Sequence, residues 1–318
     1  MSSLALVGDI GGTNARFALV EENSLELLHL QRLSCADYPT ILEAIESYLS
    51  SLALTKAPTR GCLAIAGPIT GDRINMTNNP WDFSLHALQS ALGMESLQAI
   101  NDFIAIAHAV PTLEEKQWFS IGGGEVVEGM PVAVLGPGTG LGVAGLVPAG
   151  ERWIPFATEG GHVDFAPADG TEMWILRLFQ QEFEHVSAER LLCGPGLEAL
   201  YRAVASLRDQ NAEELNAATI TERALEGSDS LCEESLKLFC GMLGSFAGNV
   251  ALTMGSLGGV ALAGGMLPRF LDFLQQSNFR ERFEAKGRYR EYMATIPTRV
   301  ILAEEPGLRG AAAALQQA

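Results

Sequence analysis

The chain has 318 residues, of which 47% are hydrophobic and 19% charged, and it carries a formal net charge of −17 at pH 7. This length suits two domains of about 100–200 residues each, and the composition is that of a globular protein with a large core. The negative charge argues against nonspecific binding to nucleic acid or to an anionic membrane, so an anionic ligand would need local backbone amides or a bound cation.

The cysteines and the N-terminus indicate a cytoplasmic protein. The five cysteines are odd in number and none belongs to a CxxC pair. Free thiols in a reducing compartment explain them better than disulfides or a zinc site. The N-terminus also lacks the basic region and apolar run of an export signal.

The first predicted element is a strand–turn–strand hairpin over residues 6–19. Glycine tolerates positive φ and has no Cβ, so the turn can present several backbone N–H groups to one phosphate. Asp9 is placed to orient Mg²⁺ or its waters, although an aspartate that stabilises its own turn is the alternative. The candidate nucleotide contacts of this hairpin are Gly8, Asp9, Ile10, Gly11, Gly12 and Thr13.

This hairpin differs from the common nucleotide-binding loops. A P-loop needs a Lys-Ser/Thr pair and then a helix, and a dinucleotide fingerprint needs a helix directly after its last glycine. Residues 13–20 alternate as a strand does, which argues against both.

The rest of the first third alternates between helices and strands. We expect a strand at 25–33, a helix at 39–49, a strand at 62–66, a helix at 84–92 and a strand at 97–100. This is an α/β order, with parallel strands after the hairpin. Asn101 and Asp102 follow the last strand, at the end where open α/β sheets bind ligands. Asp102 is equally suited to be the N-cap of a helix beginning at Phe103.

The second part of the chain repeats the hairpin after a crossing at residues 113–130. Residues 132–144 again read as strand–turn–strand, with Gly138, Thr139 and Gly140 in the turn. Either turn alone could be an ordinary hairpin, but the pair favours a polyphosphate site. Helices follow near 172–184, 196–207, 220–226 and 230–254, then a strand at 260–263, Gly264-Gly265, a helix from Pro268, a strand at 298–303 and a closing helix from Pro306.

An uncharged stretch runs from Leu238 to Pro268. Its glycines interrupt it, so we expect a buried helix followed by a buried strand rather than a membrane span.

Residues 159–165 gather two acids and a histidine around two glycines. The histidine has no second histidine at a metal-binding spacing, so a zinc site is not expected. Carboxylates accept hydrogen bonds from sugar hydroxyls and imidazole can donate or accept, so hydroxyl recognition suits this set, with a surface turn as the alternative. Residues 185–190 alone read as a solvated helix end.

Five stretches together resemble the bacterial ATP-dependent glucokinases, in that family's order and across essentially the whole chain. They are GDIGGTNAR (8–16), INDF (100–103), GTGLG (138–142), EGGHVDFAP (159–167) and HVSAER (185–190). The resemblance implies the two-domain, α/β actin-like (ribonuclease H-like) sugar-kinase fold with an interdomain cleft. The expected domains are residues 1–112 with 304–318, the smaller, and residues 113–303, the larger.

The resemblance also implies the reaction and its residues. ATP would phosphorylate the 6-hydroxyl of glucose, with Asp102 as the base, in a cytoplasmic homodimer that uses Mg²⁺. The glucose ligands would be Asn101, Asp102, Glu159, His162 and Glu189. The phosphate contacts would be the two glycine turns, with Gly264 and Gly265 on the nucleotide side. A related hexose or amino-sugar kinase, a polyphosphate-using glucokinase and a non-sugar actin-like ATPase are the alternatives.

Overall fold

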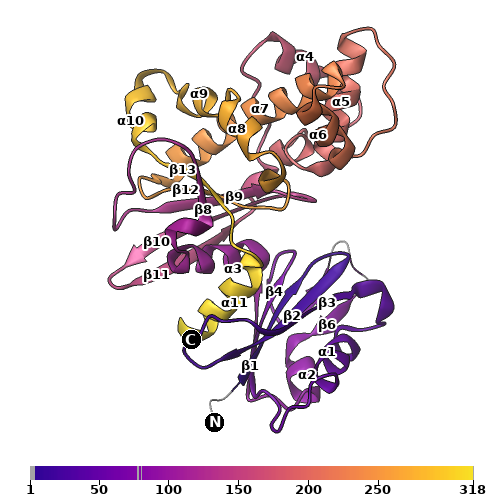
Figure 1. Ribbon diagram of the computed structural model, residues 1–318, viewed down its shortest axis with the longest axis vertical. Coiled ribbons are helices and arrows are strands. Elements are labelled where there is room, and N and C mark those ends of the chain that lie inside the picture. Colours follow the sequence, from indigo (N-terminus) through magenta and orange to yellow (C-terminus); the bar gives the residue numbers. More distant parts are fainter. Residues whose placement is uncertain (1–3, 77–78, 80, 318) are drawn as a thin grey trace. The chain divides into compact units, whose positions relative to one another are not determined.

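The computed structural model describes residues 4–76, 79 and 81–317, which divide into two compact units (Figure 1). Unit 1 consists of Met1–Leu113 and Ala303–Ala318, and unit 2 is Glu114–Leu302. The expected domain boundaries lie one residue from these. The outermost residues of the expected first domain, 1–3 and 318, fall outside the described residues.

Unit 1 contains the expected α/β sheet, with strand order β3-β2-β1-β4-β7. The strands are β1 (Leu4–Ile10), β2 (Asn14–Glu21), β3 (Leu28–Ser34), β4 (Arg60–Ile65) and β7 (Ser96–Asn101). The first pair is antiparallel, and β1–β4 and β4–β7 are parallel, as expected. A separate hairpin, β5 (Arg73–Asn75) with β6 (Asp82–Ser84), was not expected because three residues are too few to show periodicity.

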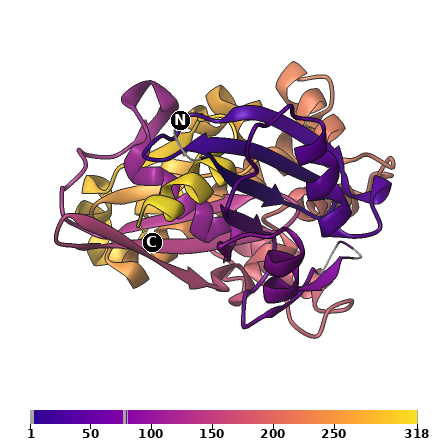
Figure 2. The same ribbon diagram turned by 90° about the horizontal axis from the view of Figure 1, so that it is seen from below.

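The helices of unit 1 cover both faces of its sheet. They are α1 (Ile41–Ser50), α2 (Leu85–Ala91), α3 (Asp102–Ala109) and α11 (Pro306–Gln317). Tyr48 of α1 stacks on Phe17 in one core, and Leu308 of α11 packs with Val7 and Cys62 in another. The expectation that the closing helix returns to the first domain is confirmed, and Figure 2 shows α11 (yellow) alongside the indigo strands.

Unit 2 is built on a sheet of order β11-β10-β9-β12-β13-β8. Its strands are β8 (Trp118–Gly122), β9 (Val132–Pro137), β10 (Leu141–Ala149), β11 (Arg152–Thr158), β12 (Gly259–Leu262) and β13 (Thr298–Ile301). The second hairpin is confirmed as β9–β10. Part of the expected crossing segment is instead β8, which pairs with β13, and the edge strand β11 was also missed.

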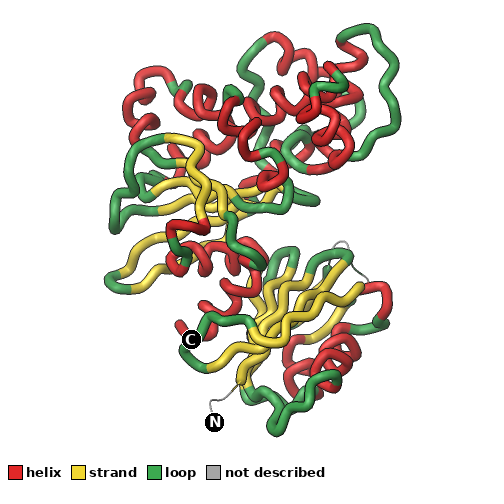
Figure 3. Tube along the Cα trace, viewed as in Figure 1, coloured by secondary structure: helices red, strands yellow, loops and turns green. Residues whose placement is uncertain are grey.

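Helices gather on one side of the unit 2 sheet, shown in red in Figure 3. They are α4 (Gly170–Phe179), α5 (Gly194–Leu207), α6 (Ala217–Glu226), α7 (Ser230–Met254), α8 (Leu271–Gln276), α9 (Phe279–Glu284) and α10 (Arg290–Thr295). The expected helix from Pro268 is wrong. Pro268 lies in a 3-10 turn, Leu267–Arg269, and α8 begins only at Leu271.

Helix α7 is the one helix in the described part of the chain that is long and apolar enough to cross a membrane, by length and composition only. Its apolar side chains, such as Leu236, Phe239 and Leu243, lie in the core of unit 2. Gly255 ends it in a left-handed conformation with φ 63°, and the buried strand β12 follows. The expected buried helix and buried strand are therefore confirmed.

Helix α11 packs so closely on α3 that there is no room for a side chain at Gly310. A Cβ at Gly310 would lie 1.6 Å from the carbonyl oxygen of Ala105, so Gly310→Ala must push the two helices apart. We expect a loss of about 1–3 kcal/mol in the free energy of unfolding, measured by denaturant titration. Gly71→Ala is the matched control, because a Cβ there meets nothing within 4 Å. Equal stability of the two variants would contradict this packing.

Candidate active site

Parallel pairing brings the polar residues of unit 1 to one edge of its sheet. Ile10 of β1 is in register with Ile65 of β4, which is in register with Asn101 of β7. The carboxyl ends of the three strands therefore coincide, which is where open α/β sheets bind ligands. Asp9, the turn that follows it, and Asp102 all belong to this edge.

The first glycine turn closes β1 onto β2. The N–H of Gly11 donates to the carbonyl of Asn14 at 3.0 Å, and the carbonyl of Gly11 accepts from Asn79 Nδ2 at 3.2 Å. Thr13 is exposed at the tip. Before the turn, the Ile10 side chain is fully buried, and a Cβ at Gly8 would lie 2.7 Å from Leu63 Cδ2. Gly8 and Ile10 therefore present no side chain to a nucleotide.

Positive φ, one of the two properties expected to matter at the glycines of the turns, does not occur there. The glycines with left-handed backbone do not include Gly11, Gly12, Gly138 or Gly140. At Gly140 the missing side chain is what matters, because a Cβ there would lie 2.5 Å from Glu189 Oε2. Glycine thus gives room to a carboxylate in the second turn.

Asp9 is paired with a residue to which sequence reasoning assigned no role. Arg16 Nη1 donates to Asp9 Oδ2 at 3.0 Å, and Arg16 Nε lies 3.0 Å from Glu305 Oε2. Burial raises the pKa of Asp9, and the charge of Arg16 opposes that rise. The signal for Arg16 was present in the sequence, because a hairpin that pairs Ile10 with Ala15 places Asp9 opposite Arg16. Glu305 carried no comparable signal.

Asp102 is the first residue of α3, and Asn101, the residue before it, is the N-cap of that helix. Asn101 Oδ1 accepts from the N–H groups of Phe103 and Ile104, at 2.9 and 3.2 Å, so the N-cap alternative for Asp102 is corrected to Asn101. Asn101 Nδ2 donates to Asp102 Oδ1 at 2.9 Å and to the carbonyl of Gly67 at 3.2 Å. The aspartate is thereby fixed by the side chain before it.

The ionisation of Asp102 is unusual for a carboxyl group. Burial, and secondarily the charge of Asp9, raise its pKa to about 6, against the opposing hydrogen bond from the Phe103 N–H. A carboxylate that titrates near neutral pH and sits at a ligand-binding sheet edge is suited to accept a proton.

In unit 2 the second turn meets the Gly264-Gly265 pair. The N–H of Gly138 donates to the carbonyl of Gly140 at 2.8 Å, and the carbonyl of Gly138 accepts from Gly194 at 2.9 Å. Gly264 is left-handed, with φ 94°, and a Cβ there would lie 2.2 Å from the carbonyl oxygen of Pro137. Thr139 is exposed, and a Cβ at Gly265 meets nothing within 4 Å. The candidate nucleotide contacts of this unit are therefore adjacent.

Three candidate sugar ligands also gather in unit 2. His162 Nε2 lies 4.0 Å from Glu159 Oε2 and 3.9 Å from Glu189 Oε1. Two backbone hydrogen bonds of 2.9 Å, from Phe165 to Val186 and from Ala188 to Val163, hold the two loops together. Glu189 Oε2 accepts from the Leu141 N–H at 2.8 Å. The segment read above as a solvated helix end is thus part of this cluster.

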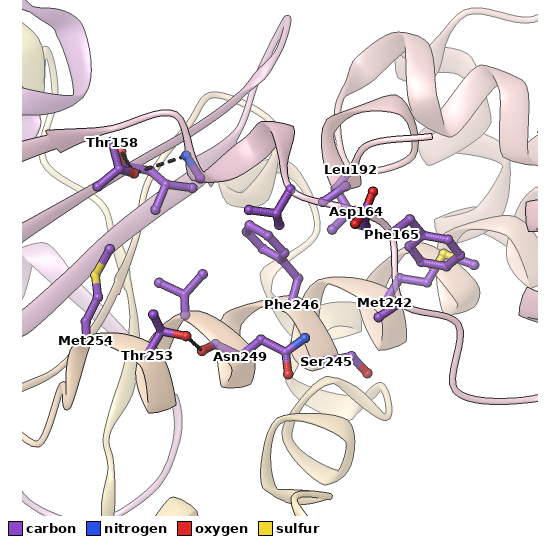
Figure 4. Close-up of a pocket in the computed structure, with 16 residues that line it drawn as sticks. Thr158, Asp164, Phe165, Leu192, Met242, Ser245, Phe246, Asn249, Thr253 and Met254 are labelled. Carbon is purple, nitrogen blue, oxygen red and sulfur yellow. Dashed lines mark hydrogen bonds between the residues drawn. The ribbon is translucent and has the colours of Figure 1, made fainter. Parts of the chain in front are cut away.

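A cavity of about 240 Å³ lies between residues 158–166 and α7 (Figure 4). Phe246, Met242, Leu192 and other apolar side chains line most of it, and Asp164 is at its edge. Glu159, His162 and Glu189 do not line it. A hexose needs convergent hydrogen-bonding groups, so this apolar cavity is distinct from the candidate sugar ligands.

The residues of unit 1 fit a magnesium ion that is shared with a phosphate. Within residues 4–76, 79 and 81–317, no group of three or more His, Cys, Asp or Glu side chains forms a metal cage. Mg²⁺ commonly keeps its waters and takes only one or two carboxylates plus substrate phosphates. Asp9 meets that requirement, because its Oδ1 receives no hydrogen bond from the described residues.

The chain is similar to known proteins over its whole length. A family model named Glucokinase matches residues 6–318. A curated protein named Glucokinase from Shigella sonnei is 48% identical over 317 residues, covering 100% of this chain and 98% of its own.

Two solved structures show the same fold. A glucokinase from an Antarctic psychrotroph has a TM-score of 0.89 at 37% identity, with 100% of both chains covered. A ROK family glucokinase from Streptomyces griseus, in complex with glucose and AMPPNP, has a TM-score of 0.69 at 19% identity and covers 99% of this chain and 100% of its own. The expected two-domain actin-like sugar-kinase fold is confirmed, and the chain belongs to the glucokinase family.

Proposed function

We propose that Asp102 is the general base with which this chain phosphorylates glucose. Membership of the family makes the chain an ATP-dependent glucose phosphotransferase. The observation that carries the proposal is the position and ionisation of Asp102. It directly follows a parallel strand, is fixed by Asn101, and has a pKa raised to about 6. At neutral pH it is ionised and can take the proton of an attacking hydroxyl.

The reaction needs positioning more than covalent chemistry. Phosphoryl transfer passes through a loose transition state, in which the attacking and leaving oxygens are roughly in line. Asp102 would orient the 6-hydroxyl of glucose and accept its proton as the bond to the γ-phosphorus forms. ADP leaves, and glucose 6-phosphate is the product. Asn101 would hold Asp102 in place and also contact the sugar.

Recognition of the other hydroxyls is proposed for Glu159, His162 and Glu189. A carboxylate oxygen of each glutamate lies within 4.0 Å of His162 Nε2. Glu189 has one oxygen fixed by the Leu141 N–H, which leaves Oε1 for a sugar hydroxyl. A site that must hydrogen-bond its substrate rejects analogues far more strongly than an apolar pocket does.

ATP binding is proposed for the two glycine turns and for Gly264-Gly265. The N–H groups of Gly12 and Thr13, and of Thr139 and Gly140, would face phosphate oxygens. Those of Gly11 and Gly138 close the turns that present them. Asp9 would hold Mg²⁺ through water, and the ion, when bound, neutralises charge on the phosphates. A cytoplasmic location and a homodimer remain predictions.

Asp102→Asn tests the base. We expect kcat to fall by about 10²–10⁴-fold, because the amide cannot accept the proton. Glucose binding, measured by intrinsic fluorescence, is expected to persist. Asp37→Asn, the same change at an exposed position of unit 1, should leave kcat unchanged. Near-normal turnover by Asp102→Asn would remove Asp102 from this role.

The pH dependence follows from the raised pKa of Asp102. The base works only when it is ionised, so kcat/KM should be flat near neutral pH and fall about tenfold per pH unit below about 6. A rate profile from pH 4.5 to 8, with a coupling system that is not limiting, measures this. An acid limb displaced to the pKa of an ordinary aspartate, near 3.8, would contradict the proposal.

Glu189→Gln tests sugar recognition. The amide can still accept from Leu141, but it offers no carboxylate to a sugar hydroxyl, so kcat/KM for glucose should fall by about 10–100-fold. Glu184→Gln, at a nearby exposed position, is the control. The wild type should prefer glucose over mannose, fructose and N-acetylmannosamine. An unchanged kcat/KM in Glu189→Gln would exclude this glutamate from the sugar site.

A further inference from the structure

Arg16 lies between two carboxylates that are almost 300 positions apart in the sequence. Its Nη1 donates to Asp9 Oδ2 at 3.0 Å, and its Nε lies 3.0 Å from Glu305 Oε2. The Nε–H is not aligned for a hydrogen bond, so the contact with Glu305 is an ion pair without one. All three side chains are partly buried, with exposures of 19 to 30%.

In this arrangement Arg16 donates only one of the two hydrogen bonds that an arginine commonly donates to a carboxylate. A guanidinium pairs most favourably with a single carboxylate through two parallel N–H groups, one to each oxygen. Here Asp9 receives one N–H on Oδ2, because the Nε edge of the guanidinium faces Glu305. Oδ1 of Asp9 accepts nothing from the described residues.

Glu305 is held where it is by the chain around it. It lies two residues beyond the boundary at which the chain re-enters unit 1, and its backbone is left-handed with φ 48°. Helix α11 begins at the next residue, and a Cβ at Gly307 would lie 3.0 Å from Asp9 Cγ. Arg309 of α11 donates to Thr112 Oγ1 and to its carbonyl, at 2.8 and 2.6 Å. These contacts of Gly307 and Arg309 fix the segment that carries Glu305 beside Arg16.

We propose that Glu305 is a positioning residue, which draws Arg16 into single-oxygen contact with Asp9 and so keeps Oδ1 available to the magnesium–nucleotide. The inference rests on the proposed role of Asp9. Without the Glu305 carboxylate, the guanidinium of Arg16 donates to both oxygens of Asp9. Oδ1 can then no longer accept a hydrogen bond from the water shell of the ion. A lysine at position 16 has a single ammonium group and cannot form that fork.

A double-mutant cycle tests this mechanism. The readout is the Kd of AMPPNP by calorimetry, without sugar, at several Mg²⁺ concentrations. Glu305→Gln should weaken Mg²⁺-dependent binding by about 10-fold or more, as loss of an outer-shell partner does. In the Arg16→Lys background, Glu305→Gln should change Kd by less than about 2-fold, because the pairwise coupling has already been removed. Equal effects of Glu305→Gln in the two backgrounds would overturn the proposal.

Two further variants separate the carboxylate from other causes. Glu304→Gln removes the same charge at the neighbouring exposed position and should leave Kd unchanged. Glu305→Gly relieves the left-handed backbone and removes the carboxylate, so it should fold at least as stably while losing the same affinity as Glu305→Gln. Wild-type affinity in Glu305→Gly, or a loss in Glu304→Gln equal to that in Glu305→Gln, would exclude a positioning role.

The outcome is distinguishable from failure of the proposed reaction. Nucleotide binding is read without glucose, so it does not depend on Asp102 being the base. Glucose affinity of Glu305→Gln, measured by fluorescence, should match the wild type, because Glu305 acts only through Arg16. If the wild type binds AMPPNP with no dependence on Mg²⁺, the proposed role of Asp9 fails and the inference fails with it.

Discussion

Two carboxylates, Asp9 and Asp102, share one edge of the unit 1 sheet, and most of the proposed chemistry depends on that crowding. Each is partly removed from water, and the charge of Asp9 helps to raise the pKa of Asp102. Moving a carboxyl pKa from 3.8 to about 6 corresponds to about 3 kcal/mol, by which the folded protein disfavours the ionised form. That cost to stability is present above about pH 6 and disappears as the group is protonated. At neutral pH the folded protein is therefore less stable with its ionised base than it would be with an unshifted carboxylate.

Mostly uncharged contacts hold the functional carboxylates in place. The Asn101 side chain both caps α3 and donates to Asp102, so the same residue stabilises the helix and aligns the carboxylate. Arg16 supplies the positive charge beside Asp9. In unit 2 the Leu141 N–H fixes Glu189, and the absent Cβ of Gly140 gives that carboxylate its room. Side chains hold the carboxylates of unit 1, and a backbone N–H beside the glycine turn holds Glu189 in unit 2.

Much of this was predictable because it is local in the sequence. Alternation of apolar residues identified both hairpins, and an uncharged apolar run indicated α7, which was predicted at its actual bounds, residues 230–254. The edge strand β11 was missed because only one side of it is paired, and Ile154 and Phe156 are exposed on it. The role of glycine in the turns was misjudged, since its conformation there is ordinary and the near contact with Glu189 comes from a distant loop. Glu305 could not be found, because its partner is set by tertiary structure and not by spacing.

Unit 1 is discontinuous in the sequence, and this bears on how the chain is made. Val7, Ala18 and Cys62 are covered by α11, which follows unit 2 in the sequence. A nascent polypeptide leaving the ribosome must therefore keep that apolar face exposed while all of unit 2 emerges. Unit 2, which is continuous, can fold first. The N-terminal segment of unit 1 has to wait for α11, and during that interval its exposed apolar face is prone to aggregation.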